Sequence, residues 1–208
     1  MELGVSKNIY YFHGEGRINL EKTIDLSIER ARDLDIRKIL IFTANGEGAF
    51  KAKELIKDDN ISILATTFPY KKQFIKKGEE KDQIIYADTS NNDVKQLFVE
   101  KGIILIQGTL PFQDIIIPGI KDIKLNTINY TLSLLSGGVR LCIESVLMAC
   151  DSGYIEQGEY VISMSADTAL VVKACRSEWL FHPEHGLEIS EIICKPNHFD
   201  ITHKSESK

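Results

Sequence analysis

Small polar residues and glycines follow an apolar run in the first quarter of the chain, at Thr43-Ala44-Asn45-Gly46-Glu47-Gly48. The run at 38–43 is typical of a strand buried on both faces of a parallel sheet. A helical pattern begins directly after the turn. A helix that starts there directs free backbone N–H groups toward the turn, and such groups can hold a phosphate. The segment therefore predicts an anion-binding junction of strand, turn and helix.

Residues of the same kind stand at three other predicted element ends, namely Asn19, Thr67 and Thr109. Ligands of open α/β sheets bind beyond the carboxyl ends of the strands, so we expect these residues to meet the turn there. Small hydroxyl and amide groups would add hydrogen bonds to a bound phosphate without adding bulk. However, Thr, Asn and Gly are also what helix caps and tight turns require without a ligand.

The turn matches neither of two common phosphate-binding motifs. It lacks the Lys-Ser/Thr ending of a Walker loop, and Gly46-Glu47-Gly48 lacks the third glycine of a dinucleotide fingerprint. The carboxylate of Glu47 would repel a phosphate unless it points away. We expect a bulky side chain at Gly46 to fill the approach path to the site.

A second set of candidate residues is acidic. Glu144 and Asp151 are seven positions apart on a predicted buried helix, and Asp167 precedes a strand that could return nearby. Such carboxylates could act as general acid and base or as metal ligands. They could equally accept backbone hydrogen bonds or pair with Arg140. The five histidines show no zinc-binding spacing, so we expect no metal site.

Composition bounds the class of protein. Of 208 residues, 43% are hydrophobic and 26% are charged, which is typical of a soluble globular domain. The net charge of −5 argues against nucleic-acid binding. Four cysteines without a CxxC pair favour a reducing compartment. With no evident signal peptide or membrane-spanning run, we expect a cytoplasmic protein without a membrane partner.

Apolar periodicity predicts that strands and helices alternate along most of the chain. We expect strands at 9–12, 38–43, 61–66, 102–107, 160–164, 168–172 and 189–194, and helices at 19–34, 47–57, 91–101, 126–135 and 139–153. We expect 68–88 to be irregular, with one short strand at 84–86. This order predicts an α/β fold, a three-layer α/β/α sandwich with a mostly parallel sheet and antiparallel C-terminal strands. We expect one domain over 1–198 and a flexible tail over 199–208.

Four groups of residues resemble the stand-alone homologues of the pyruvate kinase C-terminal α/β domain, over roughly residues 9–197. They are Gly16-Arg17-Ile18-Asn19, the turn at 43–49, residues 138–144 with 148–153, and residues 166–169 with 191–196. The resemblance implies helices on both faces of the sheet. It also implies that the turn matches the loop that holds an effector phosphate in pyruvate kinase. Gly48 stands where relatives usually have Thr, which removes one hydroxyl from that loop.

Members of this family look like binders of flavin mononucleotide (FMN) or a similar phosphorylated ligand. Pyruvate kinase activity does not follow, because the chain has no room for the catalytic barrel. We therefore expect a protein that binds a phosphorylated small molecule at Asn19, Thr43 to Gly48, Thr67 and Thr109. One alternative is a flavin- or phosphometabolite-dependent enzyme that uses Glu144, Asp151 or Asp167. Another is a scaffold or homo-oligomeric protein that keeps the fold without the site.

Overall fold

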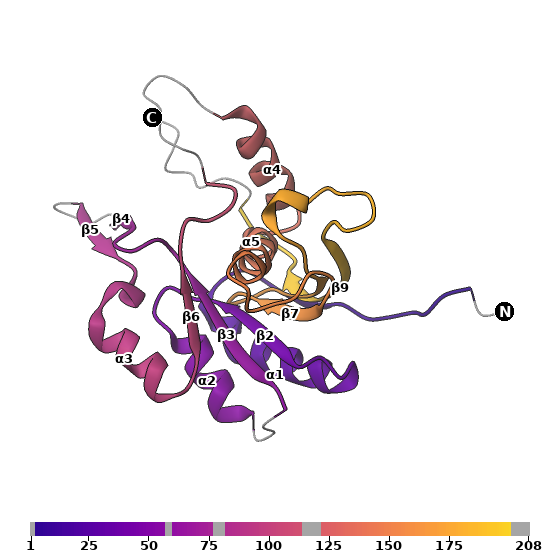
Figure 1. Ribbon diagram of the computed structural model, residues 1–208, viewed down its shortest axis with the longest axis horizontal. Helices are drawn as coiled ribbons and strands as arrows, with labels where there is room; N and C mark the ends of the chain where they lie inside the picture. Colours follow the sequence, from indigo (N-terminus) through magenta and orange to yellow (C-terminus); the bar gives the residue numbers. More distant parts are fainter. Residues whose placement is uncertain (1–2, 57–59, 77–81, 114–121, 201–208) are drawn as a thin grey trace.

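The computed structural model describes residues 3–56, 60–76, 82–113 and 122–200 (Figure 1). One sheet has the strand order β1-β9-β8-β7-β2-β3-β6. In that order the strands are β1 (Tyr10–Phe12), β9 (Glu188–Pro196), β8 (Ala169–Lys173), β7 (Tyr160–Met164), β2 (Lys38–Phe42), β3 (Ser62–Thr67) and β6 (Ile104–Gln107). All neighbours are parallel except the two pairs that β8 makes. The prediction of a mostly parallel sheet with antiparallel C-terminal strands is confirmed.

Helices cover both faces of the sheet. They are α1 (Leu20–Asp33), α2 (Glu47–Leu55), α3 (Asn92–Glu100), α4 (Ile123–Ser133) and α5 (Gly137–Asp151). α1 and α2 lie on one face and α5 lies on the other (Figure 1). Phe98 of α3 packs against Phe50 of α2, and Ile128 of α4 packs against the core that α5 covers. The predicted three-layer sandwich is therefore confirmed.

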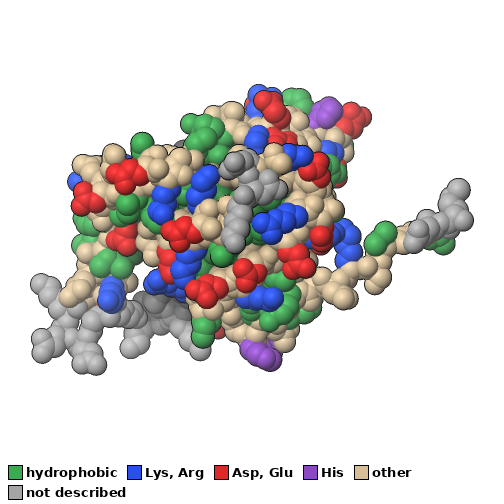
Figure 2. Space-filling view, turned by 90° about the horizontal axis from the view of Figure 1, so that it is seen from below, with side chains coloured by type: hydrophobic (Ala, Val, Ile, Leu, Met, Phe, Trp, Pro, Cys, Tyr) green, Lys and Arg blue, Asp and Glu red, His purple; other side chains and the backbone are tan. Residues whose placement is uncertain are grey.

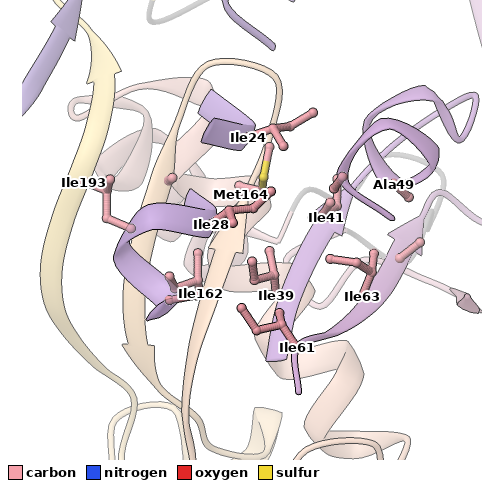
Figure 3. Packing of buried hydrophobic residues seen from close by; sticks show 14 of the residues in the cluster. Ile24, Ile28, Ile39, Ile41, Ala49, Ile61, Ile63, Ile162, Met164 and Ile193 are labelled. Carbon is pink, nitrogen blue, oxygen red and sulfur yellow. The ribbon is translucent and has the colours of Figure 1, made fainter. Parts of the chain in front are cut away.

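Strand β2 shows why the strands read as continuous apolar runs. Ile39 and Ile41 point into the cluster under α1 and α2 (Figure 3), whereas Leu40 and Phe42 point into the cluster under α5. Alternate side chains of a strand face opposite sides of a sheet. Because both sides are covered here, both sets must be apolar.

The first strand pairs with the last one, and this pairing brings distant loops together. Tyr10 of β1 lies opposite Cys194 of β9. The loop after β1 thereby reaches the turn between β7 and β8, where Gly16 N–H donates to Asp167 Oδ2 at 2.7 Å. We call the edge of the sheet at which β1, β2, β3, β6, β7 and β9 end the carboxyl edge.

The segment expected to be irregular contains a hairpin. β4 (Gln73–Lys76) and β5 (Gln83–Tyr86) pair antiparallel, and the one strand expected there corresponds to β5. The hairpin projects from the body beside α3 (Figure 1). Ile75 and Ile84 lie opposite each other and are largely exposed. Because β4 contains lysine and glutamine and buries neither face fully, its sequence does not show the alternation that predicts a strand. Three short 3-10 helices complete the described elements, namely η1 (Arg17–Asn19), η2 (Asp88–Ser90) and η3 (Ser177–Trp179).

Both signs of charge are interleaved on the surface. Figure 2 shows Lys and Arg side chains among Asp and Glu on the face seen there. None of the helices in the described ranges is long and apolar enough to cross a membrane. All four cysteines are buried and none forms a disulfide. Most of the tail predicted at 199–208 lies outside the described residues.

The N-terminus of α5 lies directly against the β7–β8 turn. Ser136 Oγ accepts a hydrogen bond from Val139 N–H at 3.2 Å and caps the helix. A Cβ atom on Gly138 would lie 2.3 Å from Thr168 Oγ1 and 2.6 Å from Ser165 Oγ. A Cβ on the neighbouring Gly137 would meet no atom within 4 Å. Residue 138 must therefore be glycine for the helix and the turn to pack this closely.

We expect Gly138→Ala to lower the free energy of unfolding by about 1–3 kcal/mol, because overpacking forces the backbone or the turn to shift. Gly137→Ala is the matched control, and we expect it to be neutral or to stabilise by up to about 1 kcal/mol, the gain from Ala in a helix. Urea unfolding followed by circular dichroism measures both. Equal stability of the two variants would contradict the close packing.

Candidate functional site

The turn after β2 caps helix α2 with its own side chains. Thr43 N–H donates to the Thr66 carbonyl at 3.0 Å and extends the pairing of β2 with β3. Thr43 Oγ1 accepts from Gly46 N–H at 2.9 Å, and Asn45 Oδ1 accepts from Glu47 N–H at 3.1 Å. Two of the N–H groups predicted to face a ligand therefore already have partners within the turn.

Gly46 has a left-handed backbone, with φ of 87°. A Cβ atom there would lie 2.5 Å from Phe50 Cε2 and 3.1 Å from Phe98 Cε2. A side chain at this position would thus point into the protein, between α2 and α3. The expectation that a bulky residue at Gly46 closes the approach path is wrong, because such a residue would disturb folding instead.

Gly48 lies where α2 approaches α1 and β2. A Cβ atom on it would lie 3.2 Å from Leu20 Cδ1 and 3.3 Å from Ile41 Cγ2, so a side chain at position 48 would start toward the core. Within the described part of the chain, no acceptor contacts the Gly48 N–H. Gly48 is buried, but it belongs to the lining of the cavity described next, where a ligand could meet this amide at the start of α2.

A cavity of about 670 Å³ opens beside this turn, and we call it the edge cavity. Its polar lining consists of the side chains of Arg17, Thr43, Asn45, Glu47 and Asp88 and the backbone at Ala44 and Gly48. Its apolar side includes Phe42, Phe68, Phe74 and Tyr86, which we call the aromatic wall. Sites for small ligands have about this size and this mixture of an apolar lining with a few polar groups.

The aromatic wall joins the hairpin to the sheet. The rings of Phe42 and Phe68 meet edge to face with centroids 4.8 Å apart. The rings of Phe68 and Phe74 meet in the same way at 4.9 Å. Each such pair is worth roughly 0.5–1.5 kcal/mol beyond the area it buries. The contacts hold β4 over the carboxyl edge and leave apolar surface facing the cavity.

Glu47 forms an ion pair with Arg17 inside the edge cavity. Arg17 Nη2 lies 2.5 Å from Glu47 Oε2, and Lys51 Nζ lies 3.5 Å from Glu47 Oε1. The hydrogen bond from Arg17 lowers the pKa of Glu47, so the carboxylate is charged at neutral pH. A carboxylate at a helix N-terminus also interacts favourably with the helix dipole. The protein thus places its own anion where the sequence predicts a phosphate.

Asp167 has a structural set of partners. Its Oδ2 accepts from Gly16 N–H at 2.7 Å, and its Oδ1 accepts from Thr168 Oγ1 at 3.1 Å and from Ser165 Oγ at 3.4 Å. Only 9% of the residue is exposed. Asp167 therefore links the β7–β8 turn to the loop after β1.

Asn19 and Thr67 lie near the edge cavity without lining it. Asn19 directly precedes α1, but its side chain donates to the Gly14 carbonyl at 2.8 Å and makes no capping bond. Thr67 is fully buried, and its Oγ1 lies 2.7 Å from Thr89 Oγ1 of η2. Thr89 N–H in turn donates to the Ala44 carbonyl at 3.0 Å. Both residues position the loops around the cavity.

Thr109 and Asp151 belong to a different cavity, of about 330 Å³. After β6 the chain packs along α5, so Thr109 does not join the turn after β2. The Asp151 carboxylate accepts from both the N–H and the Oγ of Ser177, which holds η3 against the end of α5.

Glu144 lies in the core and is fully buried. Its Oε1 accepts from Phe112 N–H at 3.1 Å, and its Oε2 has no hydrogen-bond partner among the described residues. Burial raises the pKa of Glu144, while the charge of Arg140 and the Phe112 amide oppose that rise. The three acidic candidates thus occupy three different environments. Within the described ranges, no three His, Cys, Asp or Glu residues gather as a possible metal site.

Sequence reasoning did not place the aromatic wall or Asp88 at a site. Tyr86 pairs with Gln73, and Phe74 pairs with Ile85, only because the hairpin forms. The aromatic residues on the two strands between 68 and 86 were the sequence signal that could have predicted this wall. Arg17 lies within one of the motifs on which the family resemblance rests, but its contact with Glu47 depends on how the loop after β1 folds.

Comparisons with known proteins are sparse. No protein-family model matches the sequence. Among solved structures, a pyruvate kinase chain from Cryptosporidium parvum is similar, with 14% identity and a TM-score of 0.37. The match covers 77% of this chain and 23% of that chain. A likeness this weak carries no functional argument, so the proposals below rest on the geometry of this chain.

Glu144→Gln tests the buried carboxyl. Because the pKa of Glu144 is raised in the folded state, folding favours its protonated form. The contribution of this carboxyl to the free energy of unfolding is therefore complete below the unfolded pKa, and it is lost as pH rises through the folded pKa. Gln is neutral at every pH and can still accept from Phe112 N–H. We expect its stability relative to the natural protein to grow by roughly 1–3 kcal/mol from about pH 4 to about pH 8, the cost of an unsatisfied buried group.

Urea unfolding at several pH values measures this difference. The control is Glu29→Gln, which changes an exposed carboxylate of α1. A stability difference for Glu144→Gln that stays constant over the whole pH range would contradict the raised pKa.

Proposed function

We propose that the protein binds a phosphorylated small molecule with a flat ring, such as FMN, in the edge cavity. The observation that supports this is the composition of the cavity. A guanidinium group, a helix N-terminus with an unpaired amide, and the aromatic wall all line it. A ligand with an anionic end and an apolar planar end would find partners for both.

The phosphate would lie between Arg17 and the start of α2. Arg17 is the group best suited to it, because a guanidinium can give two parallel hydrogen bonds to phosphate oxygens. The Gly48 N–H would add a third donor, and the helix dipole would favour the charge.

Binding would require Glu47 to give up Arg17. The side chain of Arg17 is 71% exposed, and ion pairs of exposed side chains contribute little to stability. A phosphate with a second negative charge can replace the carboxylate at modest cost, and Lys51 remains beside Glu47 to compensate its charge. Glu47 is therefore a competitor that the ligand displaces.

An enzymatic function finds no comparable support. Asp167 and Asp151 are engaged in hydrogen bonds that hold loops in place. Glu144 is buried away from the edge cavity. A binding function is therefore the one that the geometry supports best.

Purified protein should show saturable binding of FMN by isothermal titration calorimetry, with riboflavin binding more weakly because it lacks the phosphate. Native mass spectrometry of the protein as purified would reveal a ligand that is already bound. If FMN, riboflavin and inorganic phosphate all give no heat and no ligand mass is found, the proposal is wrong.

Two substitutions in the ion pair should act in opposite directions. We expect Arg17→Gln to weaken FMN binding by about 3- to 30-fold, the value of a partly exposed charge-assisted contact. We expect Glu47→Gln to strengthen it by about 2- to 5-fold, because the competing carboxylate is removed. Calorimetry on both variants measures the change.

Arg37→Gln is the matched control, because it also removes one surface guanidinium that pairs with a carboxylate, here Asp35. We expect it to leave FMN affinity unchanged. Parallel losses in Arg17→Gln and Arg37→Gln would mean that net charge, and not the edge cavity, governs binding.

A further inference from the structure

The charges inside the edge cavity do not suit an anion alone. Two carboxylates, Glu47 and Asp88, and one guanidinium, Arg17, line this cavity. Arg17 and Lys51 compensate Glu47. Asp88 makes no side-chain hydrogen bond or ion pair within the described ranges. The cavity therefore carries one carboxylate that the protein leaves without a cation.

The backbone around Asp88 is held in a defined position at the rim of the edge cavity. It follows Tyr86 and Ala87 in the chain, and it begins η2. Its neighbour Thr89 is fixed on both sides, through the Ala44 carbonyl at 3.0 Å and through Thr67 Oγ1 at 2.7 Å. Asp88 is exposed, but its carboxylate belongs to the same cavity lining as the aromatic wall, and its backbone is anchored through Thr89.

We infer that the ligand carries a positively charged planar ring next to its phosphate, and that Asp88 and the aromatic wall recognise this ring. The inference rests on the proposed binding of a phosphorylated molecule in the edge cavity. It narrows the ligand class from any flat ring to a cationic one, such as a pyridinium, so that FMN, whose ring is neutral, would bind the phosphate site without satisfying Asp88.

Charge and ring chemistry support this class together. A cation over an aromatic face is attracted by the quadrupole of the ring, and the attraction grows when water is displaced. A carboxylate at the same place adds direct charge compensation. A neutral ring would obtain only the apolar contact and would leave Asp88 unpaired. A cationic ring would also offset part of the repulsion between a phosphate and the two carboxylates.

Nicotinamide mononucleotide offers a matched pair of probes. Its oxidised form has a pyridinium cation, whereas its reduced form has the same phosphate and ribose with a neutral ring. We expect the oxidised form to bind roughly 5- to 30-fold more tightly in calorimetry at neutral pH, in line with a cation–π contact that is partly desolvated. Equal binding of the two forms, or tighter binding of the reduced form, would overturn the inference.

Asp88→Asn keeps the size of the side chain and removes its charge. We expect it to reduce the preference for the oxidised form to about 3-fold or less, because only the aromatic contribution remains. The control is Asp93→Asn, which removes an exposed carboxylate of α3 that does not line the cavity. A preference that Asp88→Asn leaves unchanged would overturn the role of this residue.

The outcomes separate this inference from the proposed function. If FMN and both forms of nicotinamide mononucleotide bind with similar affinity, the phosphate site stands and the cationic ring is wrong. If none of the three binds, both statements fail. If the oxidised form binds most tightly and loses that advantage in Asp88→Asn, both are supported.

Discussion

The burial of the sheet on both faces is the constraint on which the rest of the structure depends. Helices cover each face, and the N-termini of α2 and α5 both lie at the carboxyl edge, after β2 and against the β7–β8 turn. Their unpaired N–H groups need acceptors. Thr43 and Asn45 supply them at α2, and Ser136 supplies one at α5. Much of the hydrogen-bonding capacity of this edge is therefore used within the protein.

Two carboxylates at the carboxyl edge differ in how firmly they are held. Asp167 is almost fully buried and accepts three hydrogen bonds, one of them from Gly16 N–H, so its removal would leave buried donors unpaired. Glu47 is held chiefly by Arg17, which is mostly exposed. Only the contact between Arg17 and Glu47 can be replaced by a contact with a ligand at modest cost in free energy. The difference in burial thus separates a structural carboxylate from one that can respond to binding.

Local sequence patterns predicted most individual strands and helices, but they did not predict which distant residues these elements contact. The junction of β2, turn and α2 was predictable because apolar run, glycines and helical pattern are adjacent in the chain. Asn19 stands at the predicted start of a helix, but η1 precedes α1 there and the Asn19 amide donates to the Gly14 carbonyl. Of the two hairpin strands, only β5 was predicted. The exposed residues of the hairpin do not alternate between apolar and polar types, so the sequence does not distinguish a buried face from a solvated one.

The sequence by itself determined the alternation of strands and helices, the parallel sheet and the turn at 43–48, because each follows from periodicity or from residues that are neighbours in the chain. Only the tertiary structure decided which loops share a cavity. In the fold, Thr109 lines a different cavity and Glu144 and Asp167 lie in different environments. Asp88 and the aromatic wall line the same cavity as the turn. The physical reason is that a pattern specifies which face of an element is buried, but not which distant segment covers it.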